Sequence, residues 1–272
     1  MPELPEVETI KRYLVKKLKG RKIKDIIILN NKSFYGDKKE IVNSEILNIK
    51  RRGKILIFKL KNNLNLVFHM KMSGQLLFFE SLKKTDTNEI VKHSRAIFNL
   101  DKGLLIFKDT RKFGWVKILN NEELNKELKK LGKEPLVLNF KYLKETFSKS
   151  KRPIKVILMD QSKIAGIGNI YANEILFLAK IYPLTPANKL KDKEIKNLLL
   201  AIKKIIQKAI KLQGTSFRSY LKPDKSIGSY QEKFLVYQRK NKKCFRCKNK
   251  INYIKVRNRG SFYCSSCQKL VS

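Results

Sequence analysis

The chain has 272 residues, with 62 Lys and Arg against 23 Asp and Glu, so its formal net charge is +39. This charge indicates a polyanionic partner, most simply nucleic acid, although part of the excess reflects a general richness in Lys, Ile and Asn. The two histidines, His69 and His93, are too few for a zinc hydrolase built on several histidines and argue against a Ser-His-Asp hydrolase. No apolar run reaches about 18 residues and no signal peptide is evident, so we expect a cytoplasmic protein.

The first eight residues, MPELPEVE, admit two interpretations. A small residue after the initiator Met favours removal of that Met, which would leave Pro2 as an N-terminal secondary amine. An α-amino group titrates near ~7.7–8.0, so its neutral fraction can attack an electrophilic carbon and form a Schiff base. From a secondary amine the product is an iminium that keeps its charge, and Glu3 is a candidate general acid. The simpler interpretation is a helix start, with Pro5 in the first turn.

One helix followed by strands is predicted for the N-terminal half. Apolar residues at three- and four-residue spacing indicate a helix over residues 5–18. Strand-like runs separated by turn signals follow at 23–30, 45–51, 54–60, 64–70, 75–79, 95–100, 103–109 and 115–119. We expect an antiparallel β-sandwich or flattened barrel with the first helix against it, and a loop at residues 80–94.

From residue 122 the hydrophobic period becomes helical. The predicted helices span 122–131, 140–148, 154–162, 169–179 and 191–212. Gly132 and Pro135 mark a domain boundary. The tight turn Gly166-Ile167-Gly168-Asn169 precedes a helix that Asn169 is expected to cap, and the N–H groups at that helix start are suited to a phosphate. Residues 213–231 are expected to form a mobile loop.

All four cysteines lie in the last 29 residues, as two C-x2-C pairs separated by sixteen residues. Two disulfides are the alternative, but a cytoplasmic protein should not keep them. The spacing of Cys244, Cys247, Cys264 and Cys267 therefore predicts a tetrahedral structural zinc site on two knuckles. The residues between the knuckles alternate as in a hairpin, with Arg257 and Arg259 near its tip. A zinc ribbon alone does not define a function.

Two short loops place a bulky side chain beside a glycine. Residues 70–74 contain Met72, and residues 109–115 contain Phe113. Each side chain is either an ordinary core residue or a wedge that enters a DNA duplex. Lys54 follows Arg51-Arg52-Gly53 at a strand start and, taken by itself, is one more solvated lysine.

Together these motifs resemble the bacterial formamidopyrimidine-DNA glycosylases, and the resemblance covers nearly the whole chain. It rests on residues 2–8, Arg52-Gly53-Lys54, Met72-Ser73-Gly74, Arg111-Lys112-Phe113-Gly114, 166–174 (GIGNIYANE) and the cysteine ribbon that contains residues 259–264. Lys71 departs from the pattern, because the family carries Gly there. The resemblance implies an α+β fold: an N-terminal antiparallel β-sandwich catalytic domain at 1–132, a helix-two-turns-helix DNA-binding domain at 133–240 and a zinc finger at 241–272.

The resemblance also implies site residues. Pro2 would be the nucleophile and Glu3 the proton donor, while Lys54 resembles the lysine of proton transfer and phosphate contact. Arg259 resembles the zinc-finger arginine that grips a phosphate and assists δ-elimination. DNA contacts are implied for His93, Arg111, Lys149, Asn169, Met72 and Phe113. Lys151 and Arg152 are alternatives to Lys149, and the trio of Met72, Arg111 and Phe113 matches the side chains that fill the void left by a flipped base.

The implied function is base-excision repair: removal of oxidised purines such as 8-oxoguanine and formamidopyrimidines, followed by β,δ-elimination through a proline Schiff base. One alternative is an endonuclease VIII-like enzyme for oxidised pyrimidines, against which Leu4 and the void-filling trio argue. Another is a non-catalytic zinc-ribbon DNA-binding protein, which would not need Glu3 or Lys54. The expected partner is double-stranded DNA with oxidised bases, and the expected cofactor is one structural Zn²⁺ without an organic cofactor. We expect a monomer at the bacterial nucleoid, without membrane association.

Overall fold

The computed structural model describes residues 2–81, 92–216 and 222–269. Internal contacts divide the chain into two compact units. Unit 1 comprises Met1–Lys130 and Leu212–Ser229, and unit 2 comprises Leu131–Lys211 and Tyr230–Ser272. The domain boundaries predicted at 132/133 and 240/241 stay predictions. Among the described residues, no helix combines the length and the apolar character needed to cross a membrane.

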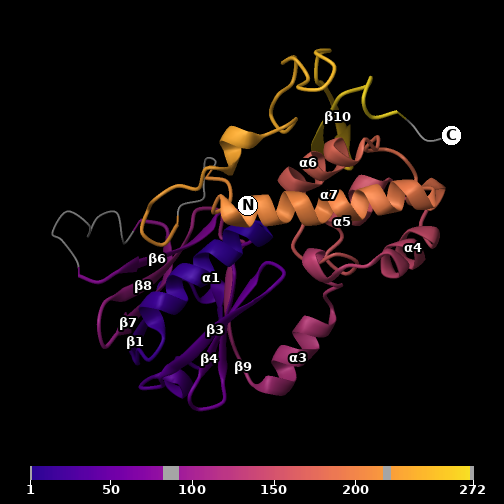
Figure 1. Cartoon of the computed structure of the whole chain (residues 1–272). Coiled ribbons are helices and arrows are strands. Elements are labelled where there is room, and N and C mark those ends of the chain that lie inside the picture. Colours follow the sequence, from indigo (N-terminus) through magenta and orange to yellow (C-terminus); the bar gives the residue numbers. More distant parts are fainter. Residues whose placement is uncertain (1, 82–91, 217–221, 270–272) are drawn as a thin grey trace. The chain divides into compact units, whose positions relative to one another are not determined.

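Unit 1 is built on two sheets, as the strand patterns predicted (Figure 1). Within the described residues, a five-stranded sheet has the order β2-β9-β5-β4-β3 and a four-stranded sheet the order β1-β7-β8-β6. The strands are β1 (Ile23–Ile28), β2 (Phe34–Tyr35), β3 (Ile46–Arg52), β4 (Ile55–Leu60), β5 (Asn65–His69), β6 (Gly74–Phe79), β7 (Ser94–Leu100), β8 (Leu104–Asp109) and β9 (Trp115–Leu119). The strand β2 was not predicted, and it pairs with β9 in parallel rather than antiparallel.

Helix α1 (Leu4–Leu18) packs its apolar face onto this sandwich. Val7, Ile10, Leu14 and Leu18 are all fully buried in one core with both sheets, as their spacing predicted. Burying such a side chain contributes roughly 1.5–3 kcal/mol, so the helix start is held firmly against the sheets. The helix α3 (Asn121–Lys129) follows β9 and is capped by Asn120, whose side chain accepts from the Glu123 N–H at 2.9 Å.

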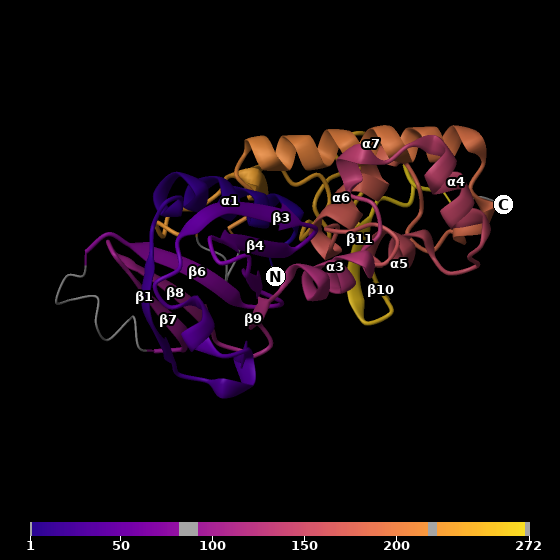
Figure 2. The ribbon, with the colours of Figure 1, turned by 90° about the horizontal axis from the view of Figure 1, so that it is seen from below.

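Unit 2 is helical with a small hairpin (Figure 2). Its helices are α4 (Phe140–Ser148), α5 (Ile154–Met159), α6 (Asn169–Ala179) and α7 (Asp192–Lys211), and its hairpin pairs β10 (Asn252–Val256) with β11 (Arg259–Tyr263). Helix α6 is buried on nearly all sides and packs against α7. Helix α5 ends three residues earlier than predicted, because Asp160 takes an extended backbone and its carboxylate accepts from the Ser162 N–H at 3.1 Å.

The predicted loops at 80–94 and 213–231 are only partly observed, since residues 82–91 and 217–221 lie outside the described residues. The remainder of the second loop is structured at both ends. The Ser229 N–H donates to the Leu212 carbonyl at 3.0 Å, and Tyr230, in the short helix η6 (Tyr230–Lys233), is fully buried.

Glu8 joins α1 to β3. Its carboxylate accepts from Arg51 at 2.9 Å and from Arg12 at 2.8 Å, and Lys11 lies 2.8 Å away. Burial alone would raise the pKa of Glu8, but the three cations outweigh it and lower the pKa from 4.5 to about 2. The folded state therefore binds the Glu8 proton more weakly than the unfolded chain does.

Glu8→Gln should lower the free energy of unfolding near neutral pH by roughly 2–3 kcal/mol. The contribution of Glu8 is complete above its unfolded pKa of 4.5 and is lost as the pH falls through about 2. The difference between wild type and variant, measured by urea unfolding, should accordingly shrink between these values. The exposed pair of Glu122 and Lys126 offers the control Glu122→Gln, which should change stability by less than about 1 kcal/mol. A difference that stays constant over this pH window would contradict the assignment.

Candidate active site and DNA interface

The start of α1 is fixed by the buried carboxylate of Glu6. Pro2 and Glu3 are buried just before the helix, and Glu3 is its N-cap. One Glu6 oxygen accepts from the Glu3 N–H and the other from the Thr215 N–H, each at 2.8 Å. Gly214 has a φ of +75°, and a Cβ there would lie 2.7 Å from Glu6 Oε1. One carboxylate thus holds the N-terminal residues against the segment that precedes residue 217.

Lys54 directly precedes Ile55 of β4, which pairs with His69 of β5, so Lys54 and His69 lie near one another. Lys54 follows Gly53 in the turn between β3 and β4 and is only 7% exposed, so it is not the solvated lysine of the simpler interpretation. Burial, then Lys71 and Lys54, lower the pKa of His69 to about 3. His69 is therefore neutral, and because its Nδ1 accepts from the Lys71 N–H at 2.9 Å, Nε2 carries the proton.

The loops at 70–74 and 109–114 lie together. The Arg111 N–H donates to Ser73 Oγ at 3.1 Å, and the Arg111 guanidinium carbon lies 5.0 Å from the centre of the Phe113 ring. Phe113 is 55% exposed and Met72 is half-buried. Phe113 is therefore not a core residue, and a large apolar ring in solvent at a loop tip is suited to inserting into a partner. Lys71, the departure from the family pattern, adopts a left-handed φ of 47°.

His93 lies exposed beside the same loops. Its φ is 67°, and its carbonyl accepts from the Asp109 N–H at 2.9 Å. Unit 1 thus carries Pro2, Glu3, Lys54, Met72, His93, Arg111 and Phe113, while Lys149, Asn169, Arg259 and the cysteines belong to unit 2.

Asn169 begins α6 but does not cap it, contrary to the prediction. Gly168 is the N-cap, with an extended backbone, and Asn169 is the first helical residue. Among the described residues, the buried Asn169 Oδ1 accepts no hydrogen bond. Gln161 shapes the preceding turn, since its Oε1 accepts from the Gly166 N–H and its Nε2 donates to the Ile167 carbonyl, both at 2.8 Å. The helix start, with its positive dipole end, is suited to an anion.

The β10–β11 hairpin presents Arg257 and Arg259 at its exposed tip, as predicted. The turn residues Arg257 and Asn258 both have positive φ, at 42° and 60°. Behind the tip, the buried Lys155 donates to the Gly260 carbonyl at 2.8 Å. Asn173 joins the hairpin to α6, because its Oδ1 accepts from the Phe262 N–H at 2.7 Å and its Nδ2 donates to the Asn169 carbonyl at 2.6 Å.

Of the three basic residues near the end of α4, Arg152 is engaged by Asp160 at 2.7 Å. Lys149 is exposed and lines a surface depression of 410 Å³ together with Arg152 and Lys163. Which of Lys149, Lys151 and Arg152 contacts a phosphate stays a prediction.

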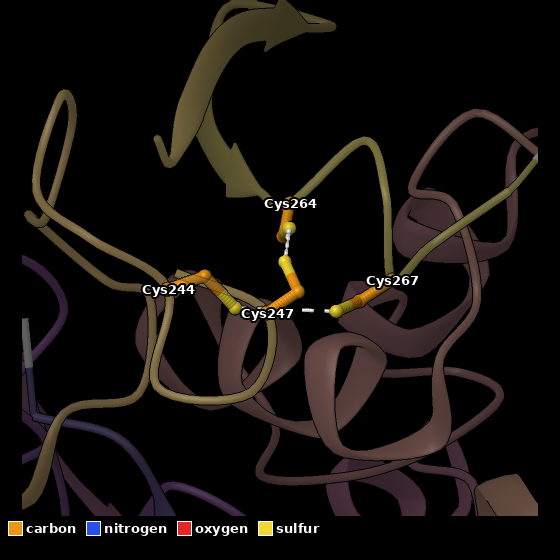
Figure 3. Close-up of side chains that lie close together, drawn as sticks. All are labelled: Cys244, Cys247, Cys264 and Cys267. Atoms are coloured by element: carbon orange, nitrogen blue, oxygen red, sulfur yellow. Dashed lines mark hydrogen bonds between the residues drawn. The ribbon is translucent and has the colours of Figure 1, made fainter. Parts of the chain in front are cut away.

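The four cysteines converge from the two knuckles (Figure 3). Their sulfur atoms all lie within 4.8 Å of one another, with Cys247 and Cys264 at 3.4 Å and Cys244 and Cys267 at 4.0 Å. All four thiols are free, so the disulfide alternative does not hold in this structure. A tetrahedral site with Zn–S bonds of about 2.3 Å separates its sulfurs by about 3.8 Å. The cluster therefore fits a metal ion of that kind.

Sequence comparison identifies the family of the chain. A family model for the formamidopyrimidine-DNA glycosylase N-terminal domain matches residues 1–116, and one for the formamidopyrimidine-DNA glycosylase H2TH domain matches residues 131–220. The chain belongs to the formamidopyrimidine-DNA glycosylase family. Relatives with that name from Rickettsia bellii and Ligilactobacillus salivarius are 40% and 39% identical to it. The alignments cover 99% and 100% of this chain and 100% of each relative.

Solved structures of the family agree over almost the full length. A variant of the Lactococcus lactis enzyme, crystallised with DNA containing Fapy-dG, is similar with a TM-score of 0.91 and 37% identity, covering 98% of this chain and 100% of that one. The wild-type Lactococcus lactis enzyme with N7-benzyl-Fapy-dG DNA gives a TM-score of 0.90 at the same identity and coverage. The α+β fold expected from the sequence is confirmed.

Sequence reasoning did not single out Glu6, Asn173 or Glu174. Glu6 looked like an ordinary acidic residue in a first helical turn. Glu174 is fully buried in α6, where it accepts backbone N–H groups from Leu235 at 2.7 Å and Val236 at 3.0 Å. Burial raises the pKa of Glu174, and these hydrogen bonds oppose the rise. The available signal was a charged residue within the apolar helix at 169–179.

Proposed function

We propose that the protein removes oxidised purines from duplex DNA and then cuts the strand at the resulting abasic site by β,δ-elimination. The family assignment supports the enzyme class, base-excision repair by a DNA glycosylase and abasic-site lyase. The observation that carries the proposal is the pairing of Pro2 with Glu3 at a helix start that Glu6 fixes at both of its oxygens. A non-catalytic DNA-binding protein would not need this arrangement.

In the proposed reaction the damaged nucleotide is flipped out of the stack, at a cost of a few kcal/mol. The Pro2 nitrogen, freed by removal of Met1, attacks the sugar C1′ while Glu3 gives a proton to help open the ring, and the base leaves. The resulting iminium acidifies C2′, so loss of its proton expels the 3′ phosphate, and a second elimination expels the 5′ phosphate. Lys54 transfers protons and contacts phosphate, and Arg259 assists the second elimination.

The DNA backbone is proposed to be held by basic and helix-end groups. Asn169 at the α6 start, Lys149 beside its surface depression and exposed His93 are the proposed contacts. The net charge of +39 agrees in sign with such binding. The void left by the flipped base is proposed to be filled by Met72, Arg111 and Phe113, with Arg111 donating to the orphaned partner base.

The four-cysteine cluster is proposed to hold one structural Zn²⁺. Four thiolates close the coordination shell, so the metal would hold the hairpin that carries Arg259 and take no part in the chemistry. No organic cofactor is proposed. We further infer that the protein acts as a monomer on oxidised double-stranded DNA at the bacterial nucleoid.

Borohydride should trap the wild-type protein covalently on DNA that contains 8-oxoguanine, because reduction fixes the iminium at Pro2. A protein that retains Met1, or carries an N-terminal tag, should not be trapped, while a matched C-terminal tag should make no difference. Undiminished trapping of the blocked protein would rule out the proline nucleophile. Parallel substrates with oxidised pyrimidines test the endonuclease VIII-like alternative, and they are needed because the Lactococcus lactis enzyme has also been crystallised with oxidised-pyrimidine DNA.

Phe113→Ala should reduce excision from duplex DNA by roughly ten- to a hundredfold, because an aromatic–base stack contributes about 1–3 kcal/mol. The melting temperature should stay close to that of wild type, since the ring is 55% exposed. Single-turnover excision and thermal unfolding are measured on the same sample. Tyr35→Ala, which removes another exposed ring from unit 1, should leave excision unchanged. Normal excision by Phe113→Ala would contradict the wedge.

The purified protein should contain one zinc per chain by elemental analysis. Cys264→Ser should lose the metal and weaken DNA binding, because the hairpin behind Arg259 depends on the knuckles. The neighbouring Ser265→Ala keeps all four thiolates and should retain the zinc. Protein prepared without chelator that holds no zinc, with its thiols oxidised, would contradict the metal assignment.

A further inference from the structure

Asp109 is the last residue of β8 and is fully buried. Its Oδ1 accepts hydrogen bonds from the Ser73 hydroxyl and from the Arg111 N–H at 3.1 Å, and its Oδ2 accepts from the Gly114 N–H at 2.6 Å. The three donors lie in the two loops that present Met72, Arg111 and Phe113. A single carboxylate therefore joins both loops.

The Asp109 backbone extends the same network to a third segment. Its N–H donates to the His93 carbonyl, and its own carbonyl accepts from Arg95 Nε at 2.8 Å and from Arg95 Nη2 at 2.6 Å. Arg95 is itself buried, at 8% exposure. The Arg95 guanidinium thus bonds to the Asp109 carbonyl, and the Asp109 carboxylate bonds to the N–H groups of Arg111 and Gly114. Together these bonds fix the backbone where β8 ends.

The loops around Asp109 hold backbone conformations that residues with a Cβ adopt rarely. Lys71, His93 and Lys112 have φ angles of 47°, 67° and 59°. Such conformations persist only where the surroundings enforce them, and they concentrate at functional sites. The fit is also close, since a Cβ on Gly114 would lie 2.7 Å from the Phe107 ring and 3.0 Å from Asp109 Oδ2.

We propose that Asp109 is a positioning residue that holds the void-filling loops in their DNA-binding shape before DNA arrives. This inference rests on the proposed function, since it concerns how that function discriminates. Burying a carboxylate is unfavourable unless its lone pairs are satisfied, and here loop N–H groups and a hydroxyl satisfy them. Loops that are already ordered lose less conformational freedom on binding. Phe113 and Arg111 can then remain exposed and still be placed accurately.

Asp109→Asn tests the proposal with almost no change in volume. The amide oxygen can replace Oδ1, but the amide nitrogen cannot accept from the Gly114 N–H, so two donors would face each other. Single-turnover excision of a lesion opposite C should fall roughly ten- to a hundredfold, as expected for loss of a hydrogen bond to a charged group. The preference for C over A opposite the lesion should also decrease, because Arg111 reads that base. Asp101→Asn, at the exposed turn before β8, is the matched control and should behave as wild type.

A double-mutant cycle separates positioning from general stability. If Asp109 acts through the wedge, Asp109→Asn should reduce excision much less in a Phe113→Ala background than in wild type. Additive effects per folded molecule, with an unchanged base preference, would overturn the proposal. Where Asp109→Asn does not fold, Ser73→Ala removes the hydroxyl that donates to Asp109 and accepts from Arg111, and it should lower excision and base preference in the same direction. Wild-type protein that excises no lesion would instead overturn the proposed function itself.

Discussion

Buried carboxylates that accept backbone N–H groups are the constraint on which the functional parts of this chain depend. Glu6 holds the N-terminal residues, Asp109 holds the loops with Arg111 and Phe113, and Glu174 holds the segment that leads into the cysteine knuckles. A buried carboxyl group without partners would be costly, whereas hydrogen bonds from backbone N–H groups satisfy its oxygens. Each carboxylate therefore selects one conformation of a segment that has no regular secondary structure to hold it.

This use of acidic side chains fits the charge of the protein. With 62 basic and 23 acidic residues, exposed carboxylates would oppose the attraction of a polyanion. Glu6, Asp109 and Glu174 lie inside, each at 1% exposure or less, where they order loops without presenting negative charge to the surface. Glu8 is a related case, since it is neutralised by Arg51, Arg12 and Lys11 while it joins α1 to β3.

Most of the helices and strands could be predicted because each carries a hydrophobic pattern within its own short stretch of sequence. The apolar face of α1, the strand alternation and the helical period of α6 and α7 are short-range signals, and their elements lie within a few residues of the predicted bounds. The strand β2 was not predicted because two residues are too few to show a period. Its partners, Val116 and Lys117, lie far along the chain. Asn169 was wrongly predicted to cap α6 because Gly168, which can also adopt the extended N-cap conformation, takes that position.

The candidate site divides in the same way. Pro2, Lys54 and the cysteines belong to motifs that can be recognised in the sequence. The carboxylates of Glu6 and Asp109, in contrast, bond to residues that are distant in the sequence. Thr215 is 209 residues from Glu6, and Asp109 is 36 residues from Ser73. No periodicity links such partners, so the sequence shows the groups that would touch DNA but not the groups that hold them in place.

The cysteine ribbon shows why this distinction matters for function. Phe177 of α6 packs in one cluster with Cys244, Cys264 and Val236, so the knuckles and the helix share a small core. Asn173, one turn into α6, bonds to the hairpin through Phe262 and to Asn169 at the helix start. Glu174, the next residue, fixes Leu235 and Val236. The helix start and the hairpin are therefore joined through Asn173 and a shared core, and we expect a change at the knuckles to disturb both Arg259 and Asn169.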